Sequence, residues 1–117
     1  MLPPAVRVFV ATAPADMRRS FDGLAALTVE ILGQDPFSGH LFVFCNRRKD
    51  RMKILYWDRS GYCLWYKRLE EGVFGLPAGE PGRVEMEAAE LAMLLEGVDL
   101  EHAKRGKRFT RPRAMAR

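Results

Sequence analysis

The residues with the clearest chemical potential form a basic run in the middle of the chain. Arg47-Arg48-Lys49 is wholly cationic, and Arg51 and Lys53 follow on alternate positions beyond a single acid, Asp50. Guanidinium and ammonium groups gathered in this way can neutralise the phosphates of nucleic acids. We therefore expect a phosphate-binding surface here. The alternative is a solvated turn that binds nothing.

A second basic segment ends the chain. Residues 104–117 carry seven Lys or Arg and no acid, whereas residues 1–103 carry 12 Lys or Arg and all 15 Asp or Glu. Basic tails of this kind bind polyanions by releasing condensed counterions, although some only increase solubility. We expect a disordered tail, and its candidate nucleic-acid-binding residues are Lys104, Arg105, Lys107, Arg108, Arg111 and Arg113.

Catalytic and metal chemistry find little support in the sequence. A two-metal nuclease needs several acids that converge on a pair of ions. The acids nearest to such a role are scattered: Asp16, Asp22, Asp50 and Asp58. Asp16 is better explained as a helix cap and Asp58 as a turn residue. The two histidines and two cysteines lack the spacing of metal ligands, and we expect the thiols to be reduced. The expectation is a non-enzyme without cofactor or metal.

The pattern of apolar residues predicts which elements must position the cations. A β-branched strand at 6–10 precedes a helix from Asp16 to about Leu32, which Gly33 ends. Three strands follow at 40–46, 51–57 and 62–69, separated by two four-residue turns. A Gly/Pro-rich loop at 72–84 leads to a second helix from about Glu85 to Glu96. We predict an α+β fold in which an antiparallel sheet, made of a three-stranded meander and the N-terminal strand, packs with two helices. Residues 1–103 form this single domain and 104–117 the tail.

The two turns fix the register of the meander and hence its faces. Phe44 faces Lys53, and Trp57 faces Tyr62 across the second turn. One face is nearly all apolar, from Leu41 to Leu69, and should lie under a helix. The other face carries the aromatic candidates Phe42, Phe44, Trp57, Tyr62 and Tyr66 with the cations Arg51, Lys53 and Arg68.

Three interpretations of the aromatic face stay open. Aromatic rings with interleaved cations on a sheet can stack single-stranded bases. An exposed aromatic face can instead dock a protein, because such patches commonly mark interfaces. It can also be covered by the second helix or the Gly/Pro loop.

Several motifs resemble one bacterial family. They begin with Asp16-Met17-Arg18 and Phe21-Asp22-Gly23-Leu24 and continue through Asp35-Pro36-Phe37-Ser38-Gly39. The longest are Asp50-Arg51-Met52-Lys53-Ile54-Leu55-Tyr56-Trp57-Asp58 and Gly61-Tyr62-Cys63-Leu64-Trp65-Tyr66-Lys67-Arg68-Leu69, and Leu91-Ala92-Met93-Leu94-Leu95-Glu96-Gly97 is the last. Together they resemble the insertion-sequence-66 accessory proteins called TnpB, the second-open-reading-frame proteins of those elements. These are unrelated to the RNA-guided nucleases of the same name.

The resemblance implies an accessory protein encoded beside a larger transposase and needed with it for efficient transposition, without known catalytic residues. We expect it to bind DNA with weak sequence preference through the basic turn and tail. Under the alternative, it docks on the transposase through Trp57, Tyr62 and Tyr66 without touching DNA. The chain shows no secretory signal and no apolar run long enough to span a membrane, so we expect a cytoplasmic protein. Its oligomeric state stays open.

Overall fold

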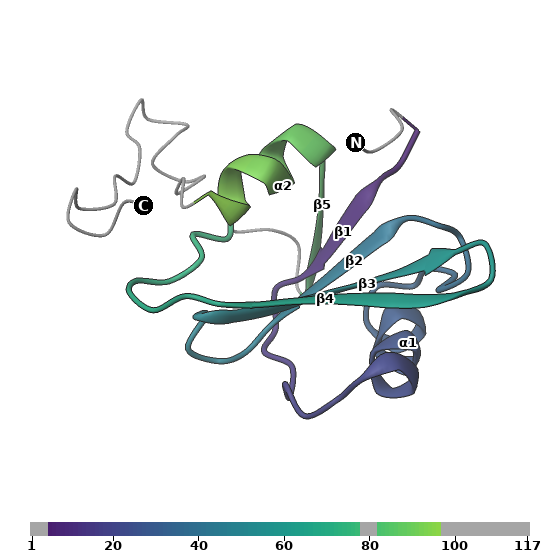
Figure 1. Ribbon diagram of the computed structural model, residues 1–117, viewed down its shortest axis with the longest axis horizontal. Coiled ribbons are helices and arrows are strands. Elements are labelled where there is room, and N and C mark those ends of the chain that lie inside the picture. Colours follow the sequence, from purple (N-terminus) through teal and green to yellow (C-terminus); the bar gives the residue numbers. More distant parts are fainter. Residues whose placement is uncertain (1–4, 78–81, 97–117) are drawn as a thin grey trace.

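A computed structural model describes residues 5–77 and 82–96. It contains one five-stranded sheet with a helix on each face (Figure 1). In chain order the elements are β1 (Val8–Ala11), α1 (Phe21–Glu30), β2 (Leu41–Cys45), β3 (Arg51–Asp58), β4 (Gly61–Arg68), β5 (Arg83–Met86) and α2 (Ala88–Leu95).

The strand order β4-β3-β2-β1-β5 confirms the α+β class and adds one strand to the predicted sheet. The sheet is mixed rather than wholly antiparallel, because β1 and β2 run parallel while every other neighbouring pair is antiparallel. β1 and β2 are parallel because α1, which lies between them in the sequence, returns the chain to the end of the sheet at which β1 began.

The predicted register of the meander is confirmed at both turns. Phe44 pairs with Lys53 across β2 and β3, and Trp57 pairs with Tyr62 across β3 and β4. Because successive side chains of a strand point to opposite faces, this register assigns each residue to the predicted face.

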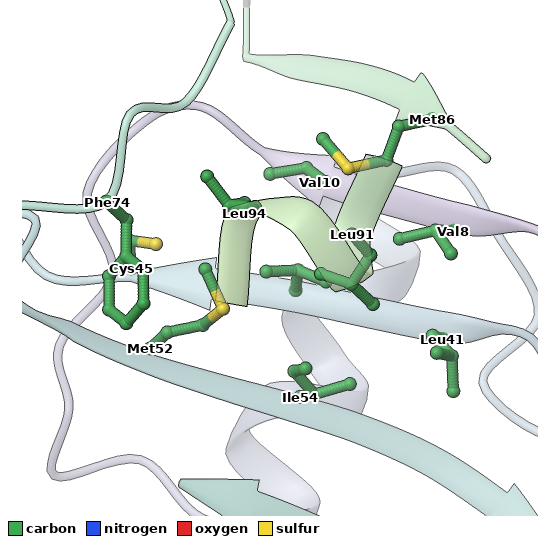
Figure 2. Close-up of a cluster of buried hydrophobic side chains, with 11 residues drawn as sticks. Val8, Val10, Leu41, Cys45, Met52, Ile54, Phe74, Met86, Leu91 and Leu94 are labelled. Carbon is green, nitrogen blue, oxygen red and sulfur yellow. The ribbon is translucent and has the colours of Figure 1, made fainter. Parts of the chain in front are cut away.

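The apolar face of the sheet lies under a helix, as predicted. Leu91 and Leu94 of α2 are buried against side chains from several strands (Figure 2). Their buried neighbours are Val8, Val10, Leu41, Val43, Cys45, Met52, Ile54, Phe74 and Met86. Burial raises the pKa of the Cys45 thiol to about 12, which keeps it protonated.

The opposite face is covered as well, and here one prediction is wrong. Phe42 and Phe44 are fully buried in a second cluster with Leu24 and Leu27 of α1. Neither phenyl ring can therefore stack a base or dock a partner. The cover is the first helix, whereas the sequence suggested the second helix or the Gly/Pro loop.

The first helix starts later than the sequence predicted. The Asp16 side chain accepts hydrogen bonds from the backbone and guanidinium of Arg18, and α1 begins at Phe21. Asp16 is thus a turn residue of the segment before α1 and does not cap the helix.

The start of the second helix is also corrected. Residues 83–86 form β5, which pairs antiparallel with β1 at the edge of the sheet. Helix α2 begins only at Ala88, where Glu87 and Glu90 form a reciprocal capping box. Glu85 instead binds the Arg7 guanidinium, with 2.7 Å between Oε2 and Nε.

Two further expectations concern the basic tail and membrane-spanning segments. The basic tail with its six candidate cations lies outside the described residues. Among the described residues, no helix combines the length and apolar character needed to cross a bilayer.

Leu24→Ala tests the packing of α1. We expect it to lower the free energy of unfolding by about 3 kcal/mol, since Leu-to-Ala changes in cores cost roughly 2–5 kcal/mol. Val29→Ala is the control, because Val29 is 56% exposed on the same helix. It should change the free energy by less than about 0.5 kcal/mol. Urea unfolding followed by circular dichroism gives both values, and equal destabilisation by the two changes would contradict the assigned packing.

Candidate nucleic-acid interface

The basic turn between β2 and β3 is held in shape by the side chain of Asn46. Its Oδ1 accepts the backbone N–H groups of Asp50 and Arg51, each at 3.1 Å, and its Nδ2 donates to Asp50 Oδ1 at 2.7 Å. Lys49 completes the turn in the left-handed region with φ of 61°. These bonds occupy Asn46 and Asp50 within the turn and leave the cations at its tip.

The three cations of the turn are exposed to solvent. Arg48 has an 85% exposed side chain and meets Asp50 only at 4.0 Å. Arg47 and Lys49 form no side-chain hydrogen bond or ion pair with residues 5–77 or 82–96. An exposed cation without a close ion-pair partner can exchange its bound water for a phosphate oxygen at little cost in free energy.

Two arginines extend the positive surface from the turn onto the sheet. Arg51 at the start of β3 lies directly opposite Arg68 at the end of β4. Together with Tyr66 and Glu70 they line an open hollow of about 330 Å³. The Arg51 guanidinium donates to the Tyr66 hydroxyl at 3.2 Å, and Arg68 Nε donates to Glu70 Oε2 at 3.0 Å. We call this surface the basic corner and define it as Arg47, Arg48, Lys49, Arg51, Tyr66 and Arg68.

Among the predicted stacking residues, Tyr66 is the member that lies in the basic corner. It is 47% exposed and lines the same hollow as the two arginines. A ring in this position can stack on a base while the guanidinium groups reach the adjoining phosphates.

Lys53 is predicted from the sequence to bind nucleic acid, and the structure assigns it a different role. The residue is only 7% exposed. Its ammonium donates to the carbonyl oxygens of Met17 at 2.7 Å and Arg19 at 2.8 Å. It also lies 4.8 Å from the centroid of the Tyr66 ring. Lys53 thus fastens the segment before α1 to the sheet and is withheld from phosphates.

The other aromatic candidates lie at the far end of β3 and β4. Trp57 and Tyr62 contact each other there, and both contact Phe37, a residue that the sequence pattern did not indicate. Phe37 is a single apolar residue within a turn motif, so no periodicity marks it. The motif Asp35-Pro36-Phe37 was the available signal, since an aspartate before a turn fixes the next backbone amides.

The acids near the basic corner are occupied by local contacts. The Asn46 amide lowers the pKa of Asp50, with further lowering from Arg48 and Arg51. Within residues 5–77 and 82–96, no three His, Cys, Asp or Glu side chains gather closely enough to hold a metal ion.

The sequence of the chain was compared with known protein families, curated proteins and solved structures. The sequence model of a family described as "IS66 Orf2 like protein" matches residues 6–105. Uncharacterized protein y4jC of Sinorhizobium fredii (strain NBRC 101917 / NGR234) is 41% identical over 111 residues, which cover 95% of this chain and 94% of that protein. Uncharacterized protein y4hO of the same strain is 40% identical over 113 residues, which cover 95% and 98% of the two chains. No solved structure gives a significant match.

Lys53→Met tests the structural role of the buried ammonium. We expect the free energy of unfolding to fall by about 2 kcal/mol, because hydrogen bonds to charged groups contribute roughly 1.5–3 kcal/mol. Arg48→Met on the turn is the exposed control and should leave stability within about 0.5 kcal/mol of the parent. Chemical denaturation measures both variants. A Lys53 variant as stable as the parent would show that the two carbonyl contacts do not hold the segment.

Proposed function

Since this chain belongs to the family of IS66 Orf2-like proteins, whose role is in the transposition of an insertion sequence, we propose that it serves that process by binding nucleic acid at the basic corner. Its part is that of an accessory protein, which holds or presents the nucleic acid while another protein performs the chemistry.

The observation that supports this proposal most directly is the state of the turn cations. Arg47, Arg48 and Lys49 are exposed on a turn whose own hydrogen bonds are complete without them. Had they been paired with acids of the body, phosphate binding would have to break those pairs first. The long contact from Arg48 to Asp50 is the nearest approach to such a pair within the described part of the chain.

The composition of the basic corner favours contact with phosphates over reading of sequence. It offers five cations and one aromatic ring, and Glu70 opposes only Arg68. Phosphate contacts position a nucleic acid without distinguishing its bases. We therefore propose weak sequence preference. The tail from Lys104 to Arg113 contributes further phosphate contacts in this proposal.

We further propose that the chain is not an enzyme. Asp16 is engaged by Arg18, and Asp50 is engaged by Asn46, so these acids serve the turns in which they lie. The family is that of an Orf2-like accessory protein, and its description gives no catalytic activity.

The transposase of the same element is the proposed protein partner. A pull-down of that transposase with this chain, with and without nuclease, separates two ways of association. Loss of the transposase on nuclease treatment indicates nucleic acid as the bridge. Retention indicates direct contact, which is the alternative function expected from the aromatic residues.

Arg47→Gln combined with Arg48→Gln tests the basic corner in the full-length chain. Removing one phosphate-binding cation should reduce the slope of log affinity against log salt by about 1, so the double change should reduce it by about 2. Binding to a duplex and to a single strand is measured by fluorescence anisotropy over a series of salt concentrations.

Arg59→Gln provides the matched control for this experiment. Arg59 is an exposed arginine in the turn between β3 and β4, at the opposite end of β3 from the basic corner. Its replacement lowers the net charge without touching the corner and should leave the slope unchanged. The single change Arg48→Gln is measured beside it, because both remove one positive charge. If Arg59→Gln weakened binding as much as Arg48→Gln, general charge rather than the basic corner would account for binding.

A further inference from the structure

The loop that precedes β2 holds Phe37 in a solvent-exposed position through its own hydrogen bonds. The residue is 58% exposed although its side chain has no polar atom to favour that position. Asp35 Oδ1 accepts the Phe37 backbone N–H at 2.9 Å, and Asp35 O accepts the Ser38 N–H at 3.1 Å. Gly39 then turns the chain with φ of 86° and leads it into β2. Exposed apolar residues that form a contiguous patch commonly mark interaction sites.

The Phe37 ring forms a compact group with two aromatic side chains of the meander. Its centroid lies 5.0 Å from that of Trp57, edge to face, and 5.5 Å from that of Tyr62, stacked. Trp57 and Tyr62 lie 5.1 Å apart, also edge to face. We call these three residues the aromatic cluster. They present ring faces and edges together at one end of the sheet.

The aromatic cluster has acidic residues near it. Asp35 lies in the same loop as Phe37 and accepts its backbone N–H. Burial raises the pKa of Tyr62, and the negative charges of Asp22 and Asp35 raise it further. Asp58 follows Trp57 directly at the end of β3, and Arg59 is the neighbouring cation in that turn. An anionic ligand such as a nucleic acid would meet these acids at the rim. A cation would be attracted by the acids and by the negative faces of the rings.

We propose that the aromatic cluster docks a cationic peptide segment of a partner protein, with an arginine or lysine side chain stacked on Phe37 or Trp57 and paired with Asp22 or Asp35. Arginine is well suited to this position, because its planar guanidinium can stack on a ring and still donate to a carboxylate.

The aromatic cluster is separate from the basic corner. Arg51 begins β3 and Trp57 lies six residues further along it, a separation of roughly 20 Å at the usual rise of a strand. One sheet can therefore hold an anion at one end and a basic peptide at the other. The inference does not depend on nucleic-acid binding at the basic corner, and either can fail alone.

The test uses full-length protein and a fluorescein-labelled peptide that alternates arginine with glycine. We expect binding by anisotropy at low salt, and no binding of the same peptide with glutamate in place of arginine. Phe37→Ala should weaken the affinity about tenfold, which is the effect of removing a central aromatic contact. Val29→Ala, which truncates an exposed apolar residue of α1 that is not a member of the aromatic cluster, should leave affinity unchanged.

Asp35→Asn separates charge from loop structure. The asparagine keeps an oxygen that can accept the Phe37 N–H, so the loop is retained while one carboxylate is removed. Affinity for the peptide should fall and depend less on salt. This variant also keeps the proposal testable if Phe37→Ala fails to fold, which circular dichroism would reveal.

Three results would overturn the proposal. The first is unchanged peptide affinity in Asp35→Asn and in a folded Phe37→Ala. The second is equal binding of the glutamate peptide. The third is a loss of single-strand affinity, rather than peptide affinity, on Phe37→Ala, which would assign the aromatic cluster to nucleic acid. The combined changes of Arg47 and Arg48 to glutamine serve as the cross-check, since they should leave peptide binding intact whether or not they reduce binding of nucleic acid.

Discussion

One buried ammonium decides which surfaces of this protein are available for binding. Lys53, the third residue of β3, donates to the backbone carbonyls of Met17 and Arg19. That pair of bonds fixes the segment from which α1 starts, and α1 then covers Phe42, Phe44 and Leu55. A buried charge must be compensated, and the two carbonyl dipoles supply the compensation. The helix is therefore tied to the sheet by the cation that the sequence suggested for phosphate binding.

Since both faces of the central strands are covered, the two proposed binding surfaces lie at the two ends of β3 and β4. Cations gather where β2 turns into β3, and aromatic rings gather beside acids where β3 turns into β4. The two ends differ in charge as well as in chemistry. This arrangement suits an accessory protein, since separate ligands could be held without competing for one surface.

The alternation of side chains between the two faces of a strand and the length of the two turns were enough to predict the meander, because each of its strands pairs with its neighbour in the chain. Residue types alone also identified the face that α2 covers. The parts that failed depend on distant partners. β5 exists because residues 83–86 meet β1, more than 70 residues earlier, and its sequence alone resembles the start of a helix. Lys53 bonds to backbone carbonyls, which leave no mark in the sequence, and Phe37 stands alone in a turn. The exposed cations of the basic turn were identifiable because turns with several charges rarely find buried partners.

The pairing of Arg51 with Arg68 has a thermodynamic consequence. Like charges directly opposite each other on adjacent strands repel, and each guanidinium here turns to a different neighbour, Tyr66 or Glu70. Glu70 neutralises Arg68 alone, because Arg51 meets only the uncharged Tyr66 hydroxyl, and the open end of the hairpin therefore keeps a net positive charge. Any anion that settles between the two guanidinium groups would offset that charge, so occupancy and folding would reinforce each other.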